Sequence, residues 1–182
     1  VIKRNNVDKI VKLIPAEERK KLWGMGIKIG RYHIYLPKML KPKAVEFRIS
    51  LWKIYHNLSA KNKIPKSGLN FLIGLKFDKD FLLLCGFEKF REFFVRIDIL
   101  EKLFLKIIDS TKDKKFTVNA DMMNLLGCSK ENFYKLMTYM DYKKDKAVDT
   151  YIFKGDKRKK KKIIQFDKKE NPFNKLLSLN IK

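Results

Sequence analysis

The stretch that decides the fold covers residues 98–140 and reads DILEKLFLKIIDSTKDKKFTVNADMMNLLGCSKENFYKLMTYM. Its first part carries apolar side chains at helical spacing, among them Leu100, Leu103 and Ile107. Asp98 followed by Glu101 resembles a capping box, with a carboxylate where serine or threonine is commoner. The pattern predicts a helix that begins near Asp98, followed by a short β-prone run at residues 116–118.

Two further helices are predicted after this run, with a tight turn between them. Asn119 can cap the first helix and Gly127 can end it, while Ser129 can cap the second. One face of the second helix is apolar, at the spacing typical of a buried face: Phe133, Leu136, Met137 and Met140. The other face is polar and could meet a ligand: Lys130, Tyr134, Lys135 and Thr138.

A β-hairpin is expected next, because residues 147–153 and 163–166 are rich in β-branched and aromatic side chains. Its connection would carry the basic run KRKKKK at residues 157–162. A helix, a helix-turn-helix and a hairpin follow in the order of a winged-helix domain, here residues 98–169, with a basic wing. The alternative is a small helical domain followed by a lysine-rich tail.

The amino-terminal part predicts a basic region of helix, β-hairpin and helix at residues 1–68. Pro15 and Pro42 suit the first turns of its two helices, and residues 27–37 alternate in the manner of strands. Residues 57–68 are the best linker candidate. We expect a connecting helical segment at 69–97 and a tail at 170–182. The fold class predicted is mainly α (α+β), and Trp23 and Trp52 are expected in the core.

Positive charge is unevenly distributed along the chain. The 182 residues hold 43 Lys+Arg and 20 Asp+Glu, a net charge of +23. Residues 19–66 hold 13 basic residues and one acid, and residues 143–169 hold 12 basic and 4 acidic residues. Residues 67–142 are almost balanced, with 12 basic and 11 acidic residues. A coding bias toward lysine would raise the charge everywhere, so the asymmetry favours a polyanionic partner.

Motifs for other functions are missing from the sequence. No GxxxxGK[ST] loop and no DExH or DEAD acid pair is present, so we expect no catalytic residue, and ATP and magnesium only in a separate motor. His33 and His56 lack partners at metal-ligand spacing, so no metal site is expected. Cys85 and Cys128 form no CxxC motif and are expected as reduced core residues.

The start of the chain and its apolar runs carry further expectations. The start, VIKRNN, lacks the apolar core of a signal peptide and an initiator methionine, which suggests a piece of a longer protein. Apolar runs such as residues 81–85 are far too short to span a bilayer, and these five residues predict a buried helical turn before Gly86.

Several runs together resemble the region downstream of the motor in bacterial superfamily-two helicases related to the mitochondrial degradosome RNA helicase. They are WGMGIKIGRY at 23–32, LPKMLKP at 36–42, VRIDILEKL at 95–103, MNLLGCS at 123–129 and NPFNKL at 171–176. The likeness extends from about residue 15 to residue 182. Tails in this family are usually arginine-rich, whereas this one uses lysine. The resemblance implies the carboxy-terminal accessory region of an ATP-dependent helicase without its motor.

The expected function is therefore nucleic-acid binding without catalysis, with RNA favoured over DNA. Candidate contacts fall in three groups: Arg31, Tyr32, Lys38, Lys41 and Lys43; Lys130, Tyr134, Lys135 and Thr138; and Lys157, Arg158, Lys159 and Lys160. Partners would be nucleic acid and the helicase motor domains in cis, for a cytoplasmic monomer that binds no membrane. The alternatives are a winged-helix protein-interaction module and a DNA-binding regulator, which the lack of an obvious dimerisation helix disfavours.

Overall fold

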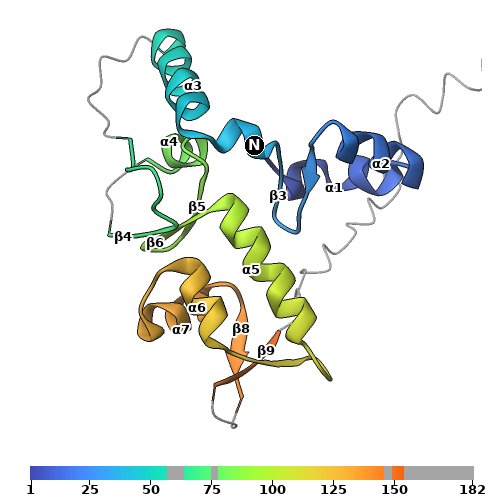
Figure 1. The fold of residues 1–182 in the computed structure, drawn as a ribbon, viewed down its shortest axis with the longest axis vertical. Coiled ribbons are helices and arrows are strands. Elements are labelled where there is room, and N and C mark those ends of the chain that lie inside the picture. The colour runs from blue at the N-terminus through green and yellow to red at the C-terminus, as the bar shows by residue number, and fades with distance from the viewer. Residues whose placement is uncertain (57–63, 75–77, 146–148, 154–182) are drawn as a thin grey trace, which may run out of the picture.

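The computed structural model of the chain describes residues 1–56, 64–74, 78–145 and 149–153. Helices make up 53% of this part, and its short strands form three antiparallel sheets of three strands each (Figure 1). The prediction of a mixed α+β chain with helix in excess is confirmed at this level.

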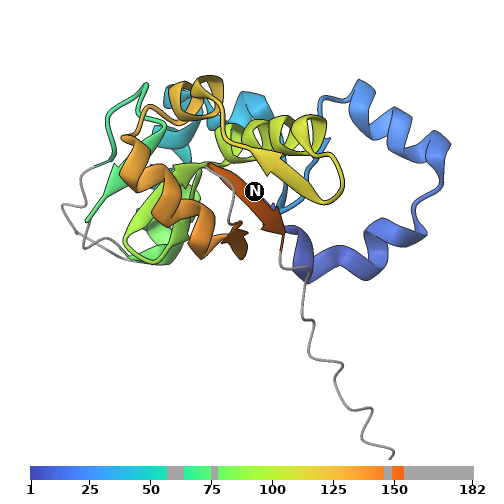
Figure 2. The ribbon, with the colours of Figure 1, turned by 90° about the horizontal axis from the view of Figure 1, so that it is seen from below.

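The first sheet belongs to the amino-terminal region. The elements of this region are β1 (Ile2–Lys3), α1 (Arg4–Leu13), α2 (Ala16–Gly24), β2 (Lys28–Ile29) and β3 (His33–Tyr35). The three strands pair in the order β1-β3-β2. The helix expected after Pro15 is present, with Pro15 as its N-cap residue. Helices α1 and α2 lie apart from the other helices (Figures 1 and 2), and Val11 is the buried residue of this pair. Trp23, expected in the core, is 61% exposed on α2, so that expectation is wrong.

The second sheet occupies the segment that we expected to be helical, residues 69–97. After the short 3-10 helix η1 (Pro37–Leu40) and α3 (Pro42–Tyr55), the chain forms β4 (Phe71–Ile73), α4 (Lys79–Leu84), β5 (Phe87–Phe90) and β6 (Phe93–Arg96). Within the part described, α4 is the helix that this segment contains, and it covers the turn expected at 81–85 up to Leu84, with Cys85 as its C-cap residue. The strands were missed because β5 and β6 join through Arg91 and Glu92, with Arg91 at φ 52°, and not through the glycine or asparagine that marks such turns.

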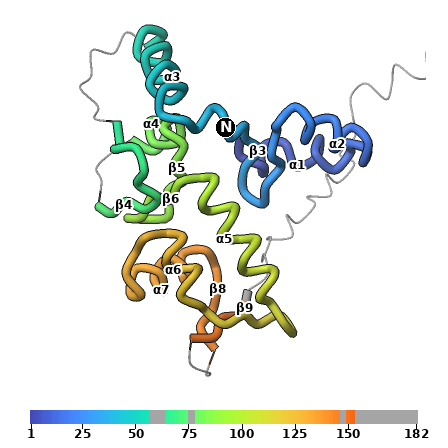
Figure 3. Tube along the Cα trace, viewed as in Figure 1, coloured from blue at the N-terminus to red at the C-terminus, as the bar shows by residue number. Residues whose placement is uncertain are grey.

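Strand β6 lies between two hydrophobic cores, because successive side chains of a strand point to opposite faces. Phe93 and Val95 belong to the larger core, and Phe94 belongs to a smaller core with α3, α4 and β5. Trp52 packs against this smaller core, 5.9 Å from the ring of Phe81. Helix α5 (Ile97–Ser110) continues directly from β6 and runs between the amino-terminal region and the carboxy-terminal elements (Figure 3).

The third sheet and two helices complete the larger core. The elements are β7 (Lys115–Thr117), α6 (Ala120–Leu126), α7 (Lys130–Tyr139), β8 (Tyr142–Lys144) and β9 (Thr150–Phe153). The predicted caps are confirmed: Asn119 Oδ1 accepts the Met122 N–H at 3.0 Å, and Ser129 Oγ accepts the Asn132 N–H at 3.3 Å. Gly127 ends α6 in the left-handed conformation, at φ 67°. The four apolar positions of α7 and its cap are buried as expected: Phe133, Leu136, Met137 and Met140.

The strand expected at residues 147–153 has other neighbours than the expected hairpin gave it. Strand β9 falls within residues 147–153, but it is the central strand of the order β7-β9-β8. Strands β7 and β8 therefore occupy both of its edges, and residues 163–166, the partner expected from the sequence, lie outside the described part. The hairpin connection is the five-residue link 145–149, and the basic run at 157–162 follows the sheet and is not its tip.

The expected capping box at the start of α5 is also wrong. The N-cap residue is Arg96, and no side chain caps it. Asp98 instead accepts two hydrogen bonds from the Arg96 guanidinium, at 2.7 and 2.9 Å. Glu101 points toward the amino-terminal region, where its carboxylate accepts hydrogen bonds from the backbone of residues 31–33.

Candidate nucleic-acid interface

The polar face of α7 brings together the four candidate contacts that the sequence placed there. Lys130, Lys135 and Thr138 are exposed, and Tyr134 is half-buried. The helix holds this face outward because its opposite side fills the larger core with Phe133, Leu136 and Met137. The Thr138 hydroxyl donates to the Tyr134 carbonyl oxygen at 3.1 Å, so the face is ordered along one helical turn.

Asp149 from the hairpin connection partly neutralises this face. Lys130 Nζ lies 2.9 Å from Asp149 Oδ2, and the Tyr134 hydroxyl donates to the same carboxylate. These two hydrogen bonds lower the pKa of Asp149. Lys144 Nζ and Lys130 Nζ also lie 5.3 and 5.5 Å from the centre of the Tyr134 ring. Two lysine ammonium groups therefore lie close to the Tyr134 ring, at the junction of α7 and the hairpin.

Three lysines gather at the start of α3. Lys38 lies on η1, Lys41 is the N-cap residue of α3 and Lys43 lies in its first turn, and all three are exposed. This first turn contains no acidic residue. Cations are unfavourable at a helix N-terminus, whose dipole is already positive, so the arrangement concentrates positive potential instead of balancing it.

Arg31 and Tyr32 occupy the loop between β2 and β3. The Tyr32 ring packs edge-on against Phe104, with ring centres 5.8 Å apart, and burial raises the pKa of its hydroxyl. The Arg31 guanidinium lies 5.5 Å from the centre of the Phe104 ring. Much of the Tyr32 ring is thus engaged in packing, whereas Arg31 is exposed. Tyr35, on the following strand β3, is buried.

The candidate contacts thus form separate groups on the described chain. Helix α7 and the start of α3 lie on different parts of the molecule, with strands β5 and β6 between them in the view of Figure 1. Arg31 and Tyr32 lie beside α5. The remaining candidates, Lys157, Arg158, Lys159 and Lys160, lie outside the described residues.

A buried carboxylate that we had expected to be a helix cap fixes the loop that carries Arg31. Glu101 accepts hydrogen bonds from the backbone N–H groups of three successive residues, Arg31 (2.6 Å), Tyr32 (2.8 Å) and His33 (2.9 Å). A Cβ atom at Gly30 would lie 2.3–2.6 Å from this carboxylate. Gly30 is therefore required for the close approach of Glu101.

His33 extends this arrangement into a charged cluster. Its Nε2 atom lies 2.8 Å from Glu88 Oε2, and Lys3 Nζ lies 2.6 Å from Glu88 Oε1. Burial opposes the charged imidazole, but the contacts with Glu101 and Glu88 outweigh it, so the pKa of His33 is raised. Burial likewise opposes ionisation of Glu88, but His33 and Lys3 outweigh it and lower the pKa of that carboxyl. The cluster ties β1, β3, β5 and α5 together.

The cluster predicts a pH dependence of stability. A raised pKa for His33 stabilises the fold below the ordinary histidine value near 6.5, and this contribution is lost as pH rises through the folded-state pKa. A lowered pKa for Glu88 stabilises the fold above its ordinary value near 4.5, and this is lost as pH falls through the folded-state pKa. The contribution is therefore greatest between about pH 5 and 6. In urea denaturation, the stability difference between the original chain and His33→Gln should shrink from pH 5.5 to pH 8.5. An equal difference at both pH values would contradict the role given to this cluster.

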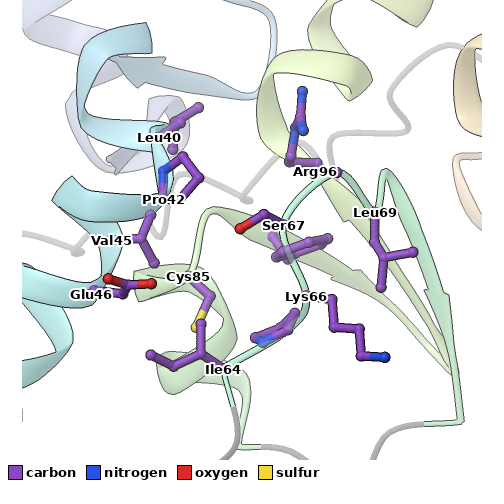
Figure 4. Close-up of a pocket in the computed structure, with 13 residues that line it drawn as sticks. Leu40, Pro42, Val45, Glu46, Ile64, Lys66, Ser67, Leu69, Cys85 and Arg96 are labelled. Atoms are coloured by element: carbon purple, nitrogen blue, oxygen red, sulfur yellow. The ribbon is translucent and has the colours of Figure 1, made fainter.

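Chemistry of other kinds has little support in the described residues. A pocket of about 260 Å³ lies between α3, the 64–69 loop and Cys85. Figure 4 shows the Lys66 ammonium pointing away from Cys85 and Glu46. Burial raises the pKa of the Cys85 thiol to about 11, so it stays protonated at neutral pH. Both cysteines are free as expected, although Cys128 is only half-buried.

The described part of the chain holds no group of three or more His, Cys, Asp or Glu side chains arranged for a metal ion. None of its helices combines the length and the apolar character needed to cross a membrane.

No family model, curated protein or solved structure matches the chain. The assignment of function therefore depends on the chain's own residues and their arrangement.

Proposed function

We propose that this chain is a nucleic-acid-binding accessory region of an ATP-dependent helicase, without the ATPase motor. The observation that carries the proposal is the uneven charge. Residues 1–56 hold 14 basic and 4 acidic side chains, and residues 143–169 add 12 basic and 4 acidic ones around a nearly balanced middle. Net charge of this size attracts polyanions and speeds their encounter with the protein. The helicase context comes from the resemblance of the runs quoted above.

We further propose that the carboxy-terminal elements form a winged-helix domain. The order α5-β7-α6-α7-β8-β9, with β9 between β7 and β8, supports this. In such a domain α7 would be the recognition helix, and the link 145–149 would be the wing. The wing is then much shorter than the sequence suggested, and the basic run at 157–162 would follow the domain as a separate phosphate-binding segment.

In this proposal the basic side chains supply affinity without sequence preference. The side chains of Lys38, Lys41, Lys43 and the 157–160 run would contact phosphates, which are the same in every nucleic-acid sequence. The α7 face, where Lys130 and Lys144 lie close to the Tyr134 ring, would position the strand. The chain would grip nucleic acid beside the motor, which would supply ATP hydrolysis.

A second candidate is a protein-interaction module, and one observation favours it. Helix α3 carries an apolar stripe that faces solvent: Phe47 (66% exposed), Leu51 (51%) and Ile54 (73%). These residues recur at four- and three-residue spacing, which is typical of a helix face that packs on a partner. The partial neutralisation of the α7 face by Asp149 points the same way.

Substitution of Lys38, Lys41 and Lys43 by alanine tests the first candidate against the second. Binding to single-stranded RNA should weaken, and the slope of log affinity against log salt should flatten by roughly 0.7 for each lost phosphate contact. Stability should change by less than about 0.5 kcal/mol, because the side chains are exposed. Fluorescence anisotropy at several salt concentrations measures the affinity for RNA and its salt slope.

The matched control replaces three exposed lysines of the charge-balanced middle, Lys79, Lys102 and Lys106, and should leave the slope nearly unchanged. If the two triple variants weaken binding equally, the start of α3 is not a specific contact. If RNA binding has no salt dependence at all, the protein-interaction candidate takes precedence.

A further inference from the structure

The described chain contains a large apolar groove, and Arg31 is the proposed contact that lies at it. It has a volume of about 740 Å³ and lies between the second half of α5 and the strands β7 and β8. Its apolar lining comes from these three elements: Phe104, Ile107, Ile108, Phe116 and Tyr142. Grooves that hold small organic ligands have volumes of about 300–1,000 Å³ and are mostly apolar, so this groove has the size and character of a binding site.

The lining is only partly needed for the core. Ile107, Phe116 and Tyr142 are almost completely buried and form part of the larger core. Ile108, in contrast, is 49% exposed although it lies next to these residues. An apolar side chain left half in water beside an apolar floor would gain from a ligand that covers it.

Two cations also line the groove. Arg31 belongs to the loop that Glu101 fixes through three backbone hydrogen bonds, and Lys114 belongs to the turn before β7. Asp113 and Lys114 are the central residues of this turn, at φ 48° and 63°, and the backbone groups of Lys112 and Lys115 hydrogen-bond to each other across it. Lysine rarely adopts this backbone conformation, so the turn holds Lys114 in place at a cost in backbone strain.

We propose that this groove binds an unpaired nucleotide of single-stranded nucleic acid. The base would lie against the apolar lining, and the flanking phosphates would contact Arg31 and Lys114. A nucleotide joins a flat apolar group to an anion, which is the combination of chemistry that the groove offers. Positively charged grooves with aromatic and apolar floors bind single strands in this way, with little sequence preference. The inference depends on the proposed function and names the site at which bases, and not only phosphates, are held.

A matched pair of substitutions on α5 tests the groove. Ile108 lines it, whereas Leu105, one turn earlier and 59% exposed, does not. Both can be replaced by glutamate, which adds the same charge to the same helix. Ile108→Glu should weaken binding of a single-stranded oligouridylate by roughly tenfold, the order expected for loss of one base contact, and Leu105→Glu should weaken it only slightly. Ile108→Ala and Leu105→Ala form a second pair without added charge and should keep the same order.

An abasic oligomer of equal length separates base contacts from phosphate contacts. It keeps the phosphates but lacks the bases, so it should bind the original chain more weakly and should not distinguish Ile108→Glu from Leu105→Glu. Lys114→Gly should weaken oligouridylate binding without lowering the thermal midpoint, because glycine relieves the strain of the turn.

Three outcomes would overturn the inference. Equal effects of the Ile108 and Leu105 substitutions, in a chain that still binds RNA with a salt dependence, would exclude the groove as a base-binding site. The proposed function would not be affected by that result. Saturation of the groove by a fatty acid that does not compete with RNA would assign it to another amphipathic anion. If the original chain binds no nucleic acid, the proposed function fails and the groove assignment fails with it.

Discussion

Substitution of Glu101 by alanine should lower the free energy of unfolding by about 3–6 kcal/mol. The side chain is buried, and its carboxylate accepts the backbone N–H groups of Arg31, Tyr32 and His33. Each buried donor left without a partner costs about 1–3 kcal/mol, and partial entry of water would keep the total near the lower end. Urea denaturation of the purified chain measures the effect, with Glu131→Ala, an exposed carboxylate on α7, as the control.

Gly30 supplies the independent check on this contact. In the original chain Gly30→Ala should destabilise the fold by about 1–3 kcal/mol, because the added Cβ would collide with the Glu101 carboxylate. In a chain that already carries Glu101→Ala the same substitution should cost much less, which a double-mutant cycle detects as a coupling energy. Additive effects of the two substitutions would show that Gly30 and Glu101 do not act on each other.

Phe133→Ala should cost about 3–5 kcal/mol, the usual range for removing a buried phenyl ring. Phe133 has no exposed surface and lies on the face of α7 that fills the larger core. The neighbouring substitution Asn132→Ala provides the comparison on the same helix and should cost much less. A cost below about 1 kcal/mol for Phe133 would mean that α7 is not anchored in this core, and its polar face would then have no fixed orientation.

The helices and their ends were the most predictable part of this fold. Asn119, Gly127 and Ser129 act locally, through the hydrogen bonds or conformation of the next turn, so their roles follow from neighbouring residues. The same holds for the helices after Pro15 and Pro42. The apolar spacing of α7 also located its buried face, because a 3.6-residue period is visible in ten residues.

The strands and the long-range contacts were much less predictable. Strands of three or four residues are too short for a clear alternation, and the turn at Arg91 and Glu92 has no glycine to mark it. The partner of β9 depends on β7, more than 30 residues earlier, and this pairing leaves no local signal. The local pattern predicts Glu101 to be part of a helix cap, whereas its hydrogen-bond partners lie about 70 residues away.

The candidate interface shows the same division. The polar face of α7 was found from spacing alone, but its neutralisation by Asp149 depends on how β8 and β9 pair. The groove beside α5 could not be predicted, because its lining comes from three elements and a loop that meet only in the folded chain. The lysines at the start of α3 could be placed from the sequence, because Pro42 predicts the first turn of that helix.

The most direct test of the central claim is the salt dependence of binding by the unaltered chain. Single- and double-stranded RNA and DNA of one length would be titrated at several salt concentrations between about 50 and 200 mM, where counterion release changes affinity most visibly. If the chain binds nucleic acid, its affinity should fall steeply with salt and depend little on sequence. The slope of log affinity against log salt should correspond to several phosphate contacts. Binding that is absent at low salt, or present with a slope near zero, would contradict the claim.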